Sequence, residues 1–303
     1  MRLDGVRVLD LSRLLPGAYC TQLLQIEGAQ ITKIESPEGD PIRRLPGGEA
    51  YFEALHQGKA RLTLDLRSEA GRQALRRHVA DADVLVEGFR PGVMERMELG
   101  YSALAALNPA LVYCAITGYG SSGPMARRAG HDLNYLARSG ALSLMPVRDG
   151  APAIPGIQVA DLAGGLQAAF LIAAGLISRR QGGRGSRVEV SMTALMHSWT
   201  TLPRAAQRAG LPGLPLTGES PCYHVYAVAD GFLTVAALES DFWSEFCRAI
   251  GREDLAGRQF DPTAIAEVQA TLRTGSRAEW STRFADRDVC VEPSLTLEES
   301  EAG

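Results

Sequence analysis

Short runs of β-branched residues alternate with helical patterns over the first 120 residues, and this alternation constrains the fold most strongly. The runs predict strands, and apolar positions spaced near 3.6 residues predict helices at 16–27 and 69–80 between them. The predicted strands cover residues 6–9, 30–34, 60–64, 84–87 and 111–116. Repeated strand-helix units favour an α/β domain with a Rossmann-like, mostly parallel sheet.

The remainder of the chain indicates a second, smaller domain. A helix rich in small residues is predicted at 161–180, and a strand at 186–192 would close the first domain. Pro, Gly and Leu then dominate 203–221 without periodicity. Apolar runs on both sides of Asp230-Gly231 indicate a hairpin. We predict a large domain at 1–195, a linker at 196–221 and a small α+β domain at 222–303.

Composition narrows the classes of partner. The 31 basic and 35 acidic residues are interleaved and give a net charge of −4, so we expect no nucleic-acid partner and no binding to a membrane surface. The five cysteines lack CxxC spacing, which predicts neither a bound metal nor a disulfide framework. No export signal is visible, and no uncharged run approaches the 18 or more residues of a membrane span. We expect a cytoplasmic protein.

A glycine-rich segment, Gly118-Tyr-Gly-Ser-Ser-Gly123, fits the GxGxxG pattern of dinucleotide sites. However, Pro124 follows it directly, and the segment comes after the fifth predicted strand rather than the first. We therefore favour a turn over a nicotinamide or flavin site.

Basic residues gather near the ends of predicted strands, and residues 87–93 follow a strand at its carboxyl end, where ligands of open α/β sheets bind. They are Arg43 and Arg44, Lys59 and Arg61, and Arg90 within residues 87–93. One interpretation is contact with ligand phosphates. In the other, Arg90 is solvated while Gly88 and Gly92 form a turn. The spacing does not separate the two, but three such clusters point to a phosphorylated ligand.

The segment Gly130-His-Asp-Leu-Asn-Tyr135 precedes an amphipathic run at 132–141 that predicts a helix with Asp132 in its first turn. A carbonyl oxygen at this helix start would meet free amides and the positive end of the helix dipole, which stabilise an enolate. His131 is a candidate proton carrier. The alternative is a satisfied, partly buried histidine or an exposed turn residue.

Two further carboxylates are candidates. Asp161 opens the long predicted helix, and helix capping is one sufficient explanation for it. The helix is almost uncharged over its first eighteen residues, so Asp161 also suits an apolar pocket where desolvation raises the pKa toward that of a general base. Glu239 follows an apolar strand at 233–238, where it would orient a histidine or cap a turn.

Several short stretches occur in a specific joint order. They are Leu9-Asp-Leu-Ser-Arg13, Lys33-Ile-Glu-Ser-Pro-Glu-Gly-Asp40, Gly88-Phe-Arg-Pro-Gly92, Gly130-His-Asp132, Gln158-Val-Ala-Asp161 and Ala237-Leu-Glu239. Through them the chain resembles, nearly end to end, the family of alpha-methylacyl-CoA racemases and class III CoA-transferases. The Gly-His-Asp-x-Asn-Tyr form resembles the racemase branch.

The resemblance implies an interlocked homodimer, with a site between the large domain of one chain and the small domain of the other. It implies coenzyme A as part of an acyl-CoA substrate, and no other cofactor. The implied coenzyme A contacts are Arg43, Lys59, Arg61, Gly88, Phe89, Arg90 and Tyr135. Asp161 would serve as the base in racemases, or as the carboxylate that forms anhydride and thioester intermediates in transferases.

We therefore predict an acyl-CoA racemase in which His131, paired with Glu239, and Asp161 flank the α-carbon of a 2-methylacyl-CoA. The amide of Asp132 would steady the enolate oxygen. A CoA-transferase that uses Asp161 is the second alternative. The third is a non-catalytic member, because the resemblance implies a C-terminal tail beyond the segment matching 289–299.

Overall fold

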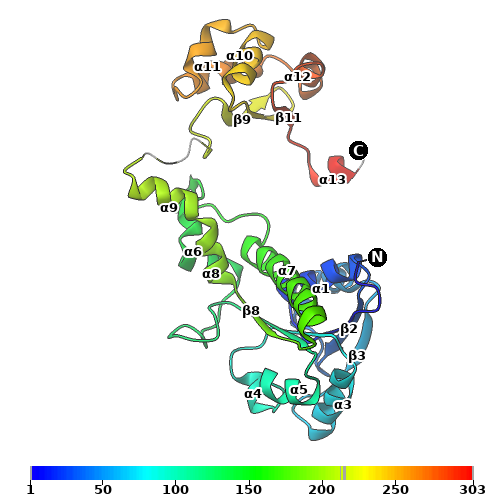
Figure 1. Cartoon of the computed structure of the whole chain (residues 1–303). Coiled ribbons are helices and arrows are strands. Elements are labelled where there is room, and N and C mark those ends of the chain that lie inside the picture. The colour runs from blue at the N-terminus through cyan, green and yellow to red at the C-terminus, as the bar shows by residue number, and fades with distance from the viewer. Residues whose placement is uncertain (1, 212, 214–215, 302–303) are drawn as a thin grey trace. The chain divides into compact units, whose positions relative to one another are not determined.

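The computed structural model describes residues 2–211, 213 and 216–301. It divides the chain into two compact units, residues 1–201 and 202–303, and Figure 1 labels many of their elements. Each unit has a hydrophobic core of its own.

The first unit is built on one six-stranded sheet. Its strands are β1 (Arg7–Asp10), β2 (Gln30–Glu35), β3 (Ala60–Thr63), β4 (Val84–Glu87), β5 (Val112–Thr117) and β8 (Arg187–Ser191), and β6 (Val147–Arg148) pairs separately with β7 (Ala151–Pro152). Its helices are α1 (Leu15–Ile26), η1 (Pro41–Arg44), α2 (Gly48–His56), α3 (Glu69–Ala80), α4 (Val93–Arg96), α5 (Tyr101–Leu107), α6 (Asp132–Ser139), η2 (Ala141–Leu144), α7 (Val159–Gly182) and α8 (Met192–Trp199).

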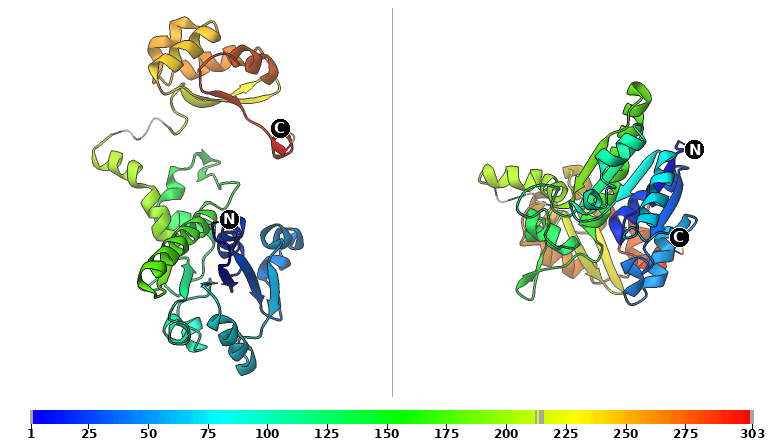
Figure 2. Two further views of the ribbon diagram at one scale, coloured as in Figure 1. Left: turned by 45° about the vertical axis from the view of Figure 1, so that its right-hand side comes forward. Right: turned by 90° about the horizontal axis from the view of Figure 1, so that it is seen from below.

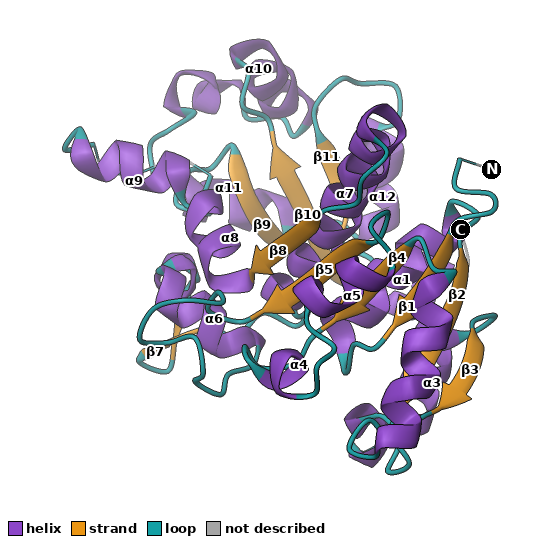
Figure 3. Ribbon diagram, turned by 60° about the horizontal axis from the view of Figure 1, so that its bottom comes forward, coloured by secondary structure: helices purple, strands orange, loops and turns teal. Residues whose placement is uncertain are grey.

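The sheet is wholly parallel and has the strand order β3-β2-β1-β4-β5-β8, which Figure 3 shows from right to left. The predicted α/β class and the predicted strands are confirmed, with boundaries that move by one residue at most sites. The order reverses between β1 and β4. In open α/β sheets the crevice at such a switch point is where ligands bind.

Successive side chains of a strand point to opposite faces of the sheet, and apolar side chains form a core on each face. In β4, Val84 and Val86 belong to the core that includes α1 and α7. Leu85 between them belongs to the opposite core, with α3 and α5. Both faces of the central strands are therefore buried, which explains why these strands read as continuous apolar runs.

Helix α7 contains an 18-residue window that is long and apolar enough to cross a membrane, by length and composition alone. This corrects the expectation drawn from the uncharged runs of the sequence. About 44% of that window is buried inside the unit, where Ala163, Ala168 and Ile172 join the core. Core packing is one sufficient reason for the low polarity of α7.

The second unit packs helices on one side of a small antiparallel sheet, as the left view of Figure 2 shows. Strands β9 (Tyr223–Val228), β10 (Gly231–Ala236) and β11 (Val291–Pro293) pair in the order β11-β10-β9. The helices are α9 (Thr201–Arg208), α10 (Ser240–Ala249), η3 (Glu253–Arg258), α11 (Ala264–Leu272), α12 (Arg277–Phe284) and α13 (Leu297–Glu301). The hairpin at Asp230-Gly231 is confirmed. Helix α9 lies within the segment predicted as a linker.

Candidate active site

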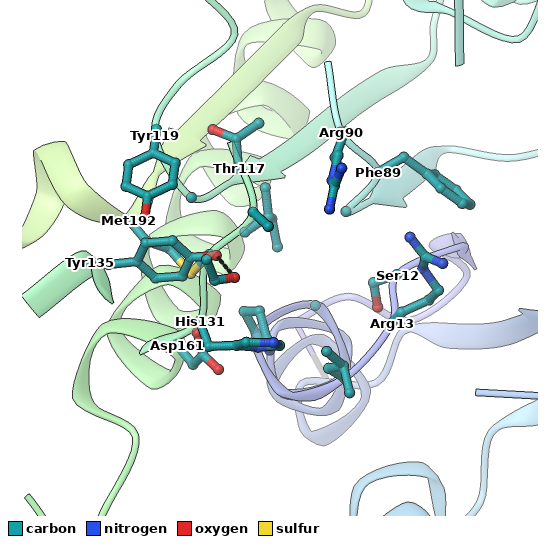
Figure 4. A pocket seen from close by; sticks show the side chains of 18 of the residues that line it. Ser12, Arg13, Phe89, Arg90, Thr117, Tyr119, His131, Tyr135, Asp161 and Met192 are labelled. Carbon is teal, nitrogen blue, oxygen red and sulfur yellow. Dashed lines mark hydrogen bonds between the residues drawn. The ribbon is translucent and has the colours of Figure 1, made fainter. Parts of the chain in front are cut away.

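A cavity of about 220 Å³ lies where the loops after β1, β4 and β5 meet. Its lining comes from residues 12–14, 16–17, 88–91, 116–119, 126 and 128–131, together with Tyr135, Asp161 and Met192. Figure 4 shows His131, Tyr135 and Asp161 on one side and Ser12, Arg13, Phe89 and Arg90 on the other. The cavity therefore opens at the carboxyl ends of the strands, beside the switch point between β1 and β4.

Asp161 is the third residue of α7, and its side chain is partly buried at the cavity. Burial raises the pKa of Asp161 to about 7, and the nearby charge of Asp132 adds to this effect. A carboxyl group with a pKa near neutrality can both accept and return a proton at physiological pH. The pKa rise that the uncharged helix suggested for Asp161 is thus present in the structure.

Asp132 joins the starts of α6 and α7. Its Oδ1 accepts hydrogen bonds from the amides of Ala160 (2.6 Å) and Asp161 (3.1 Å). The first residue before α7, Gln158, makes no capping side-chain bond, so Asp132 supplies the cap from another helix. This side-chain role was not predicted, because the sequence does not show that two segments 29 residues apart meet.

His131 immediately precedes α6, and its ring lines the cavity. The His131 amide donates to Oδ1 of Asn134 at 3.0 Å, which explains the His-x-x-Asn spacing as a helix-capping device. Because α6 begins at Asp132, the amides of Asp132 and Leu133 have no acceptor within the helix, whereas that of Asn134 donates to the His131 carbonyl at 2.8 Å. His131 therefore lies at the cavity beside the start of α6, whereas Asp132 is not among the residues that line it, so the predicted role of the Asp132 amide stays a prediction.

Tyr135 explains two glycines, Gly118 at the start of the GxGxxG segment and Gly130 beyond its end. A Cβ atom on Gly118 would lie 2.3 Å from the Tyr135 ring, and one on Gly130 would lie 2.8 Å from it. The Tyr135 hydroxyl donates to the carbonyl of Gly130, and its ring meets Tyr119 edge-on at 5.2 Å. These glycines make room for an aromatic ring, and α6 begins only at Asp132, so the favoured turn interpretation fits this geometry.

Three guanidinium groups, those of Arg13, Arg90 and Arg128, line the cavity. Among the described residues, no carboxylate forms an ion pair with them, and Arg13 lies over the Phe89 ring at 4.8 Å. Arg90, Phe89 and Gly88 were predicted as ligand contacts, whereas Arg13 and Arg128 were missed. The position of Arg13 just after the first strand was the available signal.

Arg43, Lys59 and Arg61 do not line this cavity in the described structure. Arg43 and Arg61 lie over the Phe52 ring and form ion pairs with acidic neighbours, which are Glu35 and Glu49 for Arg43 and Glu53 for Arg61. Lys59 is buried, and its Nζ donates to the carbonyl of Ala18 and to the hydroxyl of Thr21. Their contacts with coenzyme A stay a prediction.

Glu239 belongs to the second unit, where it immediately precedes α10 and is exposed. Its predicted pairing with His131 concerns both units and stays a prediction. The described geometry thus gathers His131, Asp161, Tyr135, Gly88, Phe89 and Arg90 at one cavity of the first unit.

Residues 3–302 match the family model of CoA-transferase family III, and the chain belongs to this family of enzymes. Its curated relatives carry two activities. The chain is 35% identical to alpha-methylacyl-CoA racemase of Homo sapiens over 99% of this chain and 79% of the relative. It is 33% identical to succinate–glutarate CoA-transferase of Agrobacterium fabrum over 88% of this chain and 70% of that protein.

Solved structures agree with the fold. The structure of Rv3272 from Mycobacterium tuberculosis aligns with a TM-score of 0.87 at 29% identity, covering 99% of this chain and 85% of that one. A CAIB/BAIF family protein from Brucella suis aligns with a TM-score of 0.85 at 30% identity, covering 99% and 86%.

Proposed function

We propose that this enzyme of CoA-transferase family III is an acyl-CoA racemase acting on 2-methylacyl-CoA thioesters. The observation that carries the proposal is the meeting of His131 and Asp161 at one cavity, with the Asp161 pKa raised to about 7. Racemisation needs two groups that exchange protons with one carbon, and a histidine and a near-neutral carboxyl group suit both directions.

The reaction would proceed through an enolate. One of His131 and Asp161 removes the α-proton of the thioester, and the other returns a proton to the opposite face of the carbon. Negative charge develops on the thioester oxygen, and the free amides at the start of α6, that of Asp132 included, would stabilise it. Asp132 also holds Asp161 in place, because its Oδ1 accepts hydrogen bonds from the amides of Ala160 and Asp161.

The cavity suits the acyl end of the substrate. Its volume of about 220 Å³ is below the roughly 300–1,000 Å³ of pockets that enclose drug-sized ligands, so the nucleotide end of coenzyme A would lie outside it. Arg13, Arg90 and Arg128 are exposed cations without carboxylate partners among the described residues, as anion binding requires.

The test is to incubate a single stereoisomer of 2-methylbutyryl-CoA with the enzyme in heavy water, with and without an added carboxylic acid. A racemase incorporates deuterium at the α-carbon and scrambles the stereocentre without the acid. Transfer of coenzyme A to the acid, with no deuterium incorporated, would instead establish the transferase activity. His131 at the cavity favours the first result.

A further inference from the structure

Four oppositely charged side chains are buried beneath the loop after β1. We call Asp10, Lys33, Asp40 and Lys59 the buried charge cluster, and their exposed fractions are 0%, 1%, 2% and 6%. The Lys33 ammonium lies 3.2 Å from Asp40 and 3.9 Å from Asp10, and the Lys59 ammonium lies 3.7 Å from Asp10. Two positive and two negative charges therefore balance inside the unit.

Such a cluster is a weak source of stability, because desolvation of the charges offsets their attraction. Apolar side chains of similar volume would often stabilise a fold at least as well. The cluster therefore invites a reason other than stability, and its contacts with the main chain supply one.

The cluster holds the main chain of residues 12–14. The Ser12 amide donates to Asp10 Oδ1 at 3.0 Å, and the Lys33 ammonium donates to the Ser12 carbonyl. The Leu14 amide donates to Asp40 Oδ1 at 3.2 Å. Three main-chain groups within three residues are thus bonded to buried charged side chains.

This segment adopts a conformation that it would not keep unaided. Leu14 has φ 63° and ψ −153°, a region of backbone space that is populated almost only by glycine. Such strain persists only where the surroundings impose it. Ser12, Arg13 and Leu14 also line the cavity, so the strained segment is one of its walls.

We propose that the buried charge cluster is a positioning device that fixes the 12–14 wall of the acyl-CoA cavity, with Asp40 acting through the Leu14 amide. This inference rests on the proposed function for the identity of the ligand. It assigns Asp40 and Lys33 a role in substrate affinity although neither lines the cavity.

The test is a double-mutant cycle on the full chain, with the dissociation constant of acetyl-CoA as readout. Asp40→Ala removes the acceptor of the Leu14 amide, so the wall relaxes and the dissociation constant should rise about tenfold. In a Leu14→Gly background the same change should raise the dissociation constant by less than about threefold, because glycine adopts this conformation without strain. An equal cost in both backgrounds would overturn the proposal.

Asp83→Ala is the matched control. Asp83 pairs with Arg179 at 2.8 Å and accepts the Arg7 amide at 2.8 Å, at the amino ends of β1 and β4 and away from the cavity. Its loss should lower Tm but change the dissociation constant by less than about twofold. A rise equal to that of Asp40→Ala would show that affinity merely follows stability, and would overturn the proposal.

A second comparison tests the strain at Leu14 if Asp40→Ala does not fold or if the chain binds no acetyl-CoA. Leu14→Gly and Leu14→Ala both remove the side chain, but only glycine relieves the backbone. The glycine variant should have the higher Tm, the reverse of the usual order. A higher Tm for the alanine variant would refute the strained wall. Absence of acetyl-CoA binding by the unmodified chain, by contrast, would defeat only the proposed function.

Discussion

The proposed chemistry depends on Asp161, whose carboxyl group has a pKa near neutrality. Asp161 is partly buried in the first turn of the apolar helix α7, and burial, with the charge of Asp132, brings its pKa to about 7. The ionised form that can remove a proton is therefore held at a cost in stability. Function and stability oppose each other at this position.

This opposition predicts how the contribution of Asp161 to stability changes with pH. The pKa of Asp161 is higher in the folded state than the ordinary 3.8, so its contribution to stability falls as pH rises from about 4 to about 7 and stays low above that. Asp161→Asn should raise Tm at pH 8 by about 3 °C, after allowance for its partial exposure, and by less at pH 5. Calorimetry at both pH values checks this, and a lower Tm at pH 8 would contradict it.

Gly118 supports a second prediction at this scale. A methyl group at Gly118 would overlap the Tyr135 ring, so Gly118→Ala should cost about 1–3 kcal/mol of unfolding free energy. Gly156→Ala is the control, because no atom lies within 4 Å of the added carbon there and no positive φ occurs. Urea unfolding measures both variants. If they cost the same, the packing explanation of Gly118 is wrong.

Between elements, the link from α6 to α7 places the two proposed proton carriers. Asp132→Ala removes the acceptor for two amides of α7 and should cost about 1–2 kcal/mol, while Asp132→Asn keeps an oxygen there and should cost less. Both changes remove a charge that raises the pKa of Asp161, so this pKa should fall in each. Denaturant unfolding and carboxyl titration by NMR test the two effects separately. An Asn variant as unstable as the Ala variant would argue against capping.

The strands of the large sheet could be predicted because periodicity is a local property of the sequence. The strands of the large sheet and the helix at 69–80 follow from apolar spacing alone. Strand order is not local. Periodicity does not reveal that β1 and β4 are neighbours, and only this adjacency brings Arg13 and Phe89 together.

Side-chain direction also escaped prediction. Lys59 and Arg90 both lie near strand ends in the sequence, yet Lys59 points into the buried charge cluster and Arg90 lines the cavity. Lys59 differs from Arg90 because it pairs with Asp10, which lies 49 residues away in the chain. Lys59 precedes β3 and Arg90 follows β4, so a position near a strand end does not by itself show which basic groups face a ligand.

At the scale of the whole molecule, separate cores predict separate unfolding. Trp243 and Trp280 are buried in the core of the second unit, whereas Trp199 is 56% exposed. Tryptophan fluorescence should therefore report mainly on the second unit, while far-UV circular dichroism reports on both. We expect residues 202–303, expressed alone, to show a cooperative thermal transition by fluorescence. A gradual change without a midpoint would show that this unit does not fold independently.

The central claim is that His131 and Asp161 exchange protons with the same carbon, and α-proton exchange measures this directly. Deuterium incorporation into one stereoisomer of 2-methylbutyryl-CoA should be catalysed by the unmodified enzyme. With His131→Ala and with Asp161→Ala, racemisation should fall by roughly 10²- to 10⁴-fold in each case. Full racemisation by either variant would contradict the account.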